Sequence, residues 1–193
     1  MTTLWLVRHG PTHQKSFCGW RDVPADLSDH AQIERLNTYL PEKSTLISSD
    51  LLRARQTADV LTGHHHRMDH SDQLREFNFG IWDGMTFDQV SERDPDLSRQ
   101  FWEKPGHLPA PDGESWYDVA WRASREVDNL IDRCLTKNLI IVAHFGAILT
   151  QVARAAGHTP VQAFGQHIDN LSVSRIRVEG KLWHLEDVNV TPE

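Results

Sequence analysis

Short apolar runs alternate with stretches of helical periodicity along most of the chain. The runs at 4–7 and 45–48 have the length of buried strands, and a third at 139–143 is continuous and rich in β-branched residues. Near the end of the chain, two further strand-like runs, 171–178 and 182–186, flank a polar Glu-Gly-Lys segment. They predict a terminal β-hairpin or meander.

Helices are predicted where apolar residues recur at three- and four-residue spacing. The first has Ser28 as its N-cap and runs through Leu40; the others span about 50–61, 115–134 and 147–156. The third begins with a capping-box pattern at Ser115, and the last ends at Gly157, a good helix stop. Alternating strands and helices predict an α/β three-layer sandwich, with a mostly parallel central sheet flanked by helices.

The middle of the chain, about 64–112, is polar and irregular, so only short helical patches are expected there. Four of the seven tryptophans fall between Trp82 and Trp121. We interpret about 82–115 as an inserted cap that presents flat apolar surface to a bound molecule. The alternative is that these indoles only pack helices together. With no repeat and no Ser/Gly-rich linker, residues 1–193 are expected to form a single domain.

Polar residues follow each of the three strands predicted to be parallel. Arg8 and His9 end the first strand, Arg53 lies in the first turn of the helix after the second, and His144 follows the third. Ligands of such sheets bind at the carboxyl ends of the strands, so these side chains are expected to converge on an oxyanion. Glu76 is a candidate acid for a leaving alcohol. Taken singly, each of these histidines and arginines is more often structural.

Composition limits the partners and the compartment. The formal net charge of −7 disfavours nucleic-acid binding, although a basic pocket can exist within an acidic surface. The two cysteines are far apart and lack metal or disulfide spacing, which fits a reducing compartment. No apolar run approaches membrane length, so a cytoplasmic protein without a membrane partner is expected. A monomer and a homodimer are both compatible with the sequence.

Several ordered blocks of the chain resemble the histidine phosphatase superfamily, which includes the cofactor-dependent phosphoglycerate mutases. The first is Leu-Val-Arg-His-Gly at 6–10, continued by Phe-Cys-Gly-Trp-Arg-Asp-Val-Pro at 17–24. Ser-Ser-Asp-Leu-Leu-Arg-Ala-Arg-Gln-Thr-Ala at 48–58 and Leu-Arg-Glu-Phe at 74–77 follow, and then Pro-Asp-Gly-Glu-Ser at 111–115 and Val-Ala-His at 142–144. The resemblance covers nearly the whole chain in the order of the family.

The resemblance implies a two-step phosphoryl transfer. His9 would attack phosphorus and form a phosphohistidine, while Glu76 protonates the departing oxygen. Arg8, Arg53 and His144 would hold the non-bridging oxygens, and water would then release the phosphate. The family therefore implies a metal-independent phosphomonoester hydrolase without a cofactor, acting on a small organic phosphate.

Departures from the mutase pattern favour a phosphatase. Pro11 and Lys15 stand where mutases usually carry Glu or Gln and then Asn, and Phe87 stands where they place a substrate-binding Lys. Lys15 could replace the lost phosphate contact electrostatically, and Gly19 is a further candidate phosphate-binding residue. Phe145 replaces a common Gly after the second histidine. The Pro-Asp-Gly-Glu-Ser block resembles that of α-ribazole phosphatases and broad small-molecule phosphatases.

Two other interpretations stay open: a phosphoglycerate mutase-type phosphotransferase, and a phosphate-binding module with weak or no catalysis. A metal site at the histidine run 64–66 is disfavoured, because adjacent histidines in a polar loop rarely converge on one ion. We interpret this run as a solvated loop. The chain also lacks a P-loop, a dinucleotide-binding glycine motif and a Gly-x-Ser-x-Gly elbow.

Overall fold

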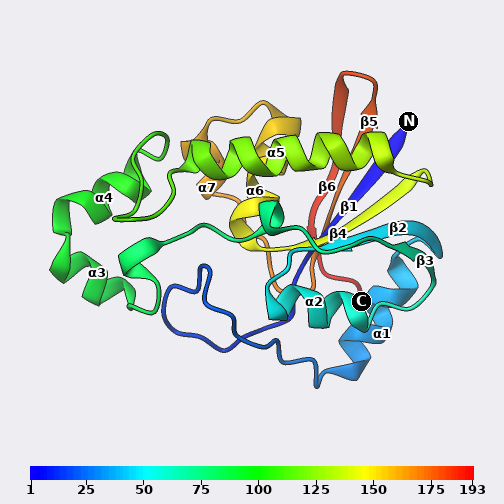
Figure 1. The fold of residues 1–193 in the computed structure, drawn as a ribbon, viewed down its shortest axis with the longest axis horizontal. Coiled ribbons are helices and arrows are strands. Elements are labelled where there is room, and N and C mark those ends of the chain that lie inside the picture. The colour runs from blue at the N-terminus through cyan, green and yellow to red at the C-terminus, as the bar shows by residue number, and fades with distance from the viewer.

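The computed structural model describes all 193 residues and has a six-stranded sheet between two layers of helices (Figure 1). The strands are β1 (Thr2–Arg8), β2 (Lys43–Ser48), β3 (His64–Arg67), β4 (Asn138–Ala143), β5 (Val173–Glu179) and β6 (Leu182–Val190). The helices are α1 (His30–Tyr39), α2 (Leu52–Asp59), α3 (Phe87–Arg93), α4 (Pro95–Glu103), α5 (Trp116–Arg133), α6 (Phe145–Ala156) and α7 (Pro160–Phe164), and two short 3₁₀ turns lie at Asp72–Leu74 and Gly80–Trp82.

The sheet has the order β3-β2-β4-β1-β5-β6 and is mostly parallel. The pairs β1–β4, β2–β4 and β2–β3 are parallel, whereas β5 is antiparallel to both β1 and β6. This arrangement confirms the predicted α/β class, the mostly parallel sheet and the terminal hairpin. It also places the ends of β1, β2 and β4 next to one another.

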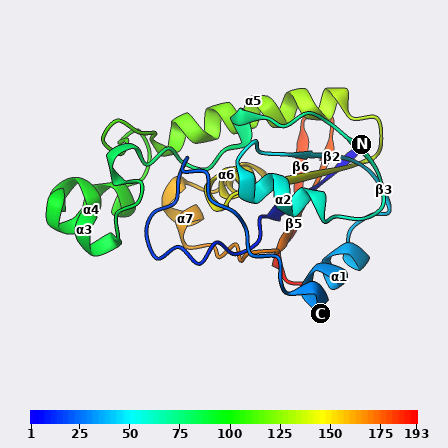
Figure 2. The same cartoon turned by 60° about the horizontal axis from the view of Figure 1, so that its bottom comes forward.

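Each face of the central strands packs on its own apolar core, as the continuous apolar runs require. Leu4, Leu6 and Ile141 face one core with α5 and α6, while Val7 and Ile140 face the other with α1 and α2. The two views place α5 on one side of the sheet and α1 and α2 on the other (Figures 1 and 2). The structure is therefore a three-layer sandwich.

Helix α5 is the longest element, and its sequence accounts for both its start and its position. Ser115 accepts a hydrogen bond from the backbone N–H of Asp118, whose carboxylate accepts one from the N–H of Ser115 in return. The apolar stripe predicted for this helix is buried, with Val119 and Leu130 both fully inaccessible. The cap and the stripe together fix the helix against the sheet.

Helices α3 and α4 lie to one side of the sheet, away from the sandwich (Figure 2). Trp82 is fully buried and donates to the Asp94 carboxylate, and Trp116 is only 4% exposed. These two indoles pack between elements, as the alternative interpretation of the tryptophans held. Trp102 stacks on Phe17, with ring centroids 5.7 Å apart, so α4 contacts the loop that follows β1.

Two local predictions are wrong, and one short helix was not predicted. The N-cap of α1 is Asp29, whose side chain accepts from the N–H of Gln32, and not its neighbour Ser28. The histidine run 64–66 is not a solvated loop but part of the edge strand β3, in which His65 hydrogen-bonds to Ser44. Helix α7 was not predicted at all. No helix of the chain combines the length and the apolar character that a membrane crossing needs.

Candidate active site

Four of the sequence-predicted residues meet at the carboxyl ends of the strands. Arg8 is the last residue of β1 and His9 follows it, while His144 is the N-cap of α6 directly after β4. The parallel register pairs Arg8 with Ala143, so the two imidazoles lie side by side with ring centroids 5.0 Å apart. Arg53, from the first turn of α2, reaches His9 from the β2 side.

The hydrogen bonds of His9 fix its tautomer. Arg53 Nε lies 3.2 Å from His9 Nε2, and because a guanidinium can only donate, Nε2 must be the unprotonated acceptor. The proton therefore resides on Nδ1, which donates to the Gly10 carbonyl at 2.7 Å. His9 is 5% exposed, and burial, with Arg53 and Arg8 nearby, lowers its pKa to about 3. Nε2 is thus a neutral nitrogen with a lone pair.

His144 is completely buried, and neither of its ring nitrogens has a hydrogen-bond partner. Burial and the neighbouring Arg53 and His9 hold its pKa well below the usual histidine value. An unpartnered polar ring in a buried position is costly unless something else satisfies it. The imidazole is therefore available to a bound group next to His9.

Arg53 is buried, and backbone carbonyl groups accept hydrogen bonds from its guanidinium. Its Nη1 donates to the carbonyl of Arg21 at 2.9 Å and its Nη2 to that of Gly19 at 2.7 Å. The loop carrying these carbonyls is itself held by Asp83, which accepts from the N–H groups of Gly19 and Arg21 and from Arg21 Nε. The loop after β1 thus aims Arg53 at His9.

Arg8 presents a second cation. Its Nη1 donates to the Ile168 carbonyl at 2.6 Å, its buried Nε has no partner, and the guanidinium lies 5.8 Å from the centre of the Phe145 ring. Two fixed guanidiniums beside two neutral imidazoles form a small, positively charged site in a protein of formal net charge −7. Planar guanidiniums of this kind match the oxygens of a phosphoryl group.

Glu76 is 7% exposed, and its side chain lies against the first turn of α6. Its Oε1 accepts from the backbone N–H groups of Phe77 and Gly146, both at 2.9 Å, which leaves Oε2 without a hydrogen bond in the protein. Burial raises the pKa of Glu76 above the usual glutamate value, although Arg53, Arg8 and the two N–H donors oppose the shift. Burial therefore shifts the equilibrium of Glu76 towards its protonated form.

The two remaining candidates, Lys15 and Gly19, differ in their position relative to this cluster. Lys15 is exposed and has no polar contact with the other site residues. Gly19 is buried beside the site, but its N–H donates to Asp83 and its carbonyl accepts from Arg53. The phosphate-binding roles of Lys15 and Gly19 stay predictions.

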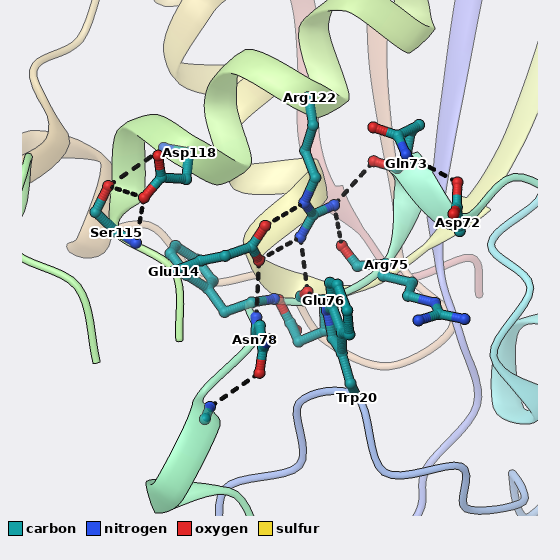
Figure 3. A network of polar contacts seen from close by, with 12 residues as sticks. Trp20, Asp72, Gln73, Arg75, Glu76, Asn78, Glu114, Ser115, Asp118 and Arg122 are labelled. Carbon is teal, nitrogen blue, oxygen red and sulfur yellow. Dashed lines mark hydrogen bonds and ion pairs between the residues drawn. The ribbon is translucent and has the colours of Figure 1, made fainter. Parts of the chain in front are cut away.

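Several residues around the site were not found from the sequence. Thr57 Oγ1 accepts from the N–H of Gly10, and the Asn170 side chain donates to the His9 carbonyl. Arg122 and Glu114 form a buried ion pair behind Glu76 (Figure 3). A charged residue next to the buried stripe of α5 was the only signal for Arg122, and Glu114 was visible only within a block that resembles the family.

The sequence model of the histidine phosphatase superfamily (branch 1) matches residues 4–191. The chain belongs to this superfamily. A probable phosphoglycerate mutase of Shigella boydii is 27% identical over 191 residues, covering 95% of this chain and 88% of that protein. The chain spans about half the length of the first curated relatives it matches, with 30% identity over 93% of this chain and 51% of theirs.

Two solved structures match the fold over nearly the whole chain. Bacillus stearothermophilus YhfR is 30% identical with a TM-score of 0.86, covering 96% of this chain and 95% of that one. A mycobacterial glucosyl-3-phosphoglycerate phosphatase, solved with VO3, is 26% identical with a TM-score of 0.83, covering 98% and 100%. The site therefore lies in a chain whose similar proteins include a phosphatase and a probable mutase.

Gly146 provides a test of how Glu76 is placed. A Cβ at Gly146 would lie 2.5 Å from Glu76 Oε1 and 2.2 Å from the Phe77 ring, so Gly146→Ala must displace the carboxyl group. We expect Gly146→Ala to lower the turnover of a phosphate ester by about 100-fold, as loss of an aligned acid does. In Gly165→Ala, the control, the nearest atom is at an ordinary 3.5 Å, and turnover should be unchanged. Wild-type turnover in Gly146→Ala would contradict the described packing.

The neutral state of His9 predicts how stability depends on pH. The folded protein keeps His9 neutral down to about pH 3, whereas the unfolded chain protonates it below about 6.5. The unfolded state therefore binds more protons in this window, and stability falls as pH falls. Between pH 7 and pH 4, urea unfolding should show about 3 kcal/mol less loss for His9→Asn than for wild type. His158→Asn, at an exposed position, is the control and should follow wild type; equal slopes for all three would refute the shift.

Proposed function

We propose that the chain is a phosphomonoester hydrolase that acts on a small organic phosphate through a phosphohistidine on His9. The tautomer of His9 carries this proposal. Its Nε2 lone pair accepts only from Arg53, while Nδ1–H is held by Gly10. A neutral imidazole fixed in this way is a nucleophile that needs no proton removed before attack.

In the first step, His9 Nε2 attacks phosphorus and the bond from phosphorus to the ester oxygen breaks. Glu76 delivers its proton from Oε2 to the departing alkoxide, so the alcohol leaves neutral. Arg8, Arg53 and His144 stabilise the charge on the three non-bridging oxygens. The orphaned ring nitrogens of His144 and the unpartnered Nε of Arg8 support this assignment.

In the second step, Glu76 is ionised and accepts a proton from water as that water attacks the phosphohistidine. The bond between Nε2 and phosphorus breaks, His9 returns to its starting state and inorganic phosphate leaves. The two guanidiniums supply the positive charge that divalent ions supply in other phosphoryl-transfer enzymes, which supports a metal-independent reaction.

As part of the same proposal, residues 1–193 form one domain in which about 82–115 is a cap over the site. The stacking of Trp102 on Phe17 supports this view, because it joins α4 to the loop that continues from His9. The negative net charge supports a small-molecule ester over a nucleic acid as the substrate.

A second candidate is a phosphotransferase of the phosphoglycerate mutase type, which the 27% identity with a probable mutase favours. The two activities differ in what receives the phosphoryl group of His9: water or a second hydroxyl. Phosphate release and bisphosphoglycerate-dependent isomerisation, measured on the same preparation, separate them. Isomerisation far faster than hydrolysis would defeat the hydrolase.

Replacing His9 tests the nucleophile. His9→Ala removes the only nitrogen placed to form the phosphohistidine, so hydrolysis across a panel of phosphate esters should fall at least about 10⁴-fold. Wild type should lose no activity in EDTA and should form an acid-labile phosphoprotein when quenched during turnover. Activity that survives His9→Ala, or that disappears in EDTA, would contradict the mechanism.

Replacing Glu76 tests the acid. Glu76→Gln keeps the size of the side chain but cannot deliver a proton in the same way, and a poor leaving group needs that proton most. We expect kcat for alkyl phosphates to fall about 10² to 10⁴-fold, and kcat for p-nitrophenyl phosphate to fall much less. Equal losses on both substrates would remove Glu76 as the general acid.

A further inference from the structure

Arg122 and Glu114 form a buried ion pair directly behind the main chain that carries Glu76 (Figure 3). Arg122 Nε lies 2.7 Å from Glu114 Oε1, and Nη2 lies 2.8 Å from Oε2, in a bidentate arrangement. The side chains are 8% and 16% exposed. Neither residue contacts the cluster of His9, Arg8, Arg53 and His144 by hydrogen bonds, so the proposed mechanism does not use them.

The rest of the Arg122 guanidinium is bound to the segment that ends in Glu76. Nη1 donates to the carbonyls of Gln73 and Arg75, both at 2.8 Å, and Nη2 donates to the carbonyl of Glu76 at 2.8 Å. With the two bonds to Glu114, all five N–H donors of Arg122 are used. Three carbonyls within four residues therefore converge on one rigid, planar group.

Glu114 holds the chain on the other side of Glu76. Its Oε2 accepts from the N–H of Asn78 at 2.8 Å, and its own N–H donates to the Asn78 carbonyl at 2.8 Å. Trp20 adds a further donor, from Nε1 to the Glu76 carbonyl at 2.8 Å. The backbone is thus bound before, at and after the acid.

This ion pair is mounted on a rigid element. Arg122 lies two turns into α5, whose start is fixed by the Ser115–Asp118 capping box and whose stripe is buried against the sheet. A buried ion pair is a poor means of stabilising a protein, since apolar residues of similar size often do as well or better. Three of the five donors of Arg122 are directed to one segment, residues 73–76, and the other two to Glu114, which indicates that the pair serves position rather than stability.

We propose that Arg122, oriented by Glu114, is a positioning residue for the proton donor: it holds residues 73–78 so that Oε2 of Glu76 faces the leaving-group oxygen. The inference rests on the proposed role of Glu76 as the acid. Alignment matters because proton transfer requires the acid within hydrogen-bond reach of the departing oxygen, and small displacements are costly.

The charges of Arg122 and Glu114 cancel, so the pair positions Glu76 and adds little electrostatic potential at its carboxyl group. Glu114→Gln keeps the shape of the side chain but leaves the Arg122 cation uncompensated next to the Glu76 main chain. That cation would lower the raised pKa of Glu76. The alkaline limb of the pH profile of kcat/KM, which reports loss of the acid form, should therefore move to lower pH in Glu114→Gln.

The test compares leaving groups in Arg122→Lys, Glu114→Gln and the control Arg175→Lys. Lysine keeps the charge of Arg122 but cannot span five acceptors, so kcat for alkyl phosphates should fall about 10- to 100-fold while p-nitrophenyl phosphate is little affected. Arg175 pairs with Asp187 and Glu186 in the β5–β6 hairpin, far from the acid in the fold. Its variant should leave both rates unchanged.

A double variant shows whether Arg122 acts through Glu76. Glu76→Gln with Arg122→Lys should be about as active on alkyl phosphates as Glu76→Gln alone, because the acid is already lost. If the losses of the two single variants multiply in the double variant, the inference is wrong. It is also wrong if Arg122→Lys lowers kcat equally for both classes of ester, or if the pH profile of Glu114→Gln does not move. If Arg122→Lys does not fold, Glu114→Gln alone decides by the same leaving-group and pH readouts.

Failure of the inference is distinguishable from failure of the proposed function. If Glu76→Gln itself lowers both classes of ester equally, then Glu76 is not the acid and the proposed function is wrong at that residue. If Glu76→Gln is selective for alkyl phosphates but Arg122→Lys and Glu114→Gln are not, the acid stands and only the positioning role is overturned.

Discussion

The parallel pairing of β1 with β4 is the constraint on which the site depends. It sets Arg8 opposite Ala143, so the residues that follow, His9 and His144, leave the sheet next to each other. Both faces of these strands are buried on separate cores. A slip of one residue would exchange the two faces, so the register is fixed by the packing of the whole sandwich. The histidine pair takes its geometry from that packing.

Burial then sets the protonation states, in opposite directions for the two kinds of group. Desolvation disfavours the charged form, so it lowers the pKa of His9 and His144 and raises that of Glu76. The guanidinium of Arg53 lies in the same surroundings, where carbonyl groups of the loop after β1 accept hydrogen bonds from its N–H groups. A neutral imidazole at His9, a carboxyl group shifted towards its protonated form at Glu76 and the positive charge of Arg53 therefore lie together in one buried site. These are the states that the proposed reaction needs at its start.

The parts of the fold that could be predicted are those with a periodic or continuous apolar pattern. The strands at 4–7, 45–48 and 139–143 lie within β1, β2 and β4, and the capping box at Ser115 begins α5. β3 was missed because an exposed edge strand of three histidines and an arginine has no apolar alternation. For α1, two adjacent N-cap formers left the choice between Ser28 and Asp29 to the loop geometry. The sequence of α7 does contain a helix start signal, because Thr159 and Gln162 form a capping box around Pro160.

Within the site, Arg8, His9, Arg53 and His144 could be placed because each follows a strand. Glu76 lies on an irregular segment, so the sequence offered it only as a candidate acid, and the resemblance to the family strengthened that prediction. The contacts of Arg122 could not be found in this way, because its carbonyl partners are nearly fifty residues earlier in the chain. Every residue also has a backbone carbonyl, so the residue type does not show which carbonyls accept a hydrogen bond from Arg122. Long-range contacts of this kind follow from the tertiary structure alone.

Asn78 and Glu114 also hold together two distant points of the chain. Their reciprocal hydrogen bonds join the two ends of the segment that carries α3 and α4. Gly113 allows this approach, since a Cβ there would lie 2.3 Å from the Asn78 carbonyl. The chain between Asn78 and Glu114, with α3 and α4, therefore starts and ends at one fixed junction next to Glu76. In the proposed enzyme, the cap helices α3 and α4 can thus vary while the contacts that Arg122 and Glu114 make with residues 73–78 stay the same.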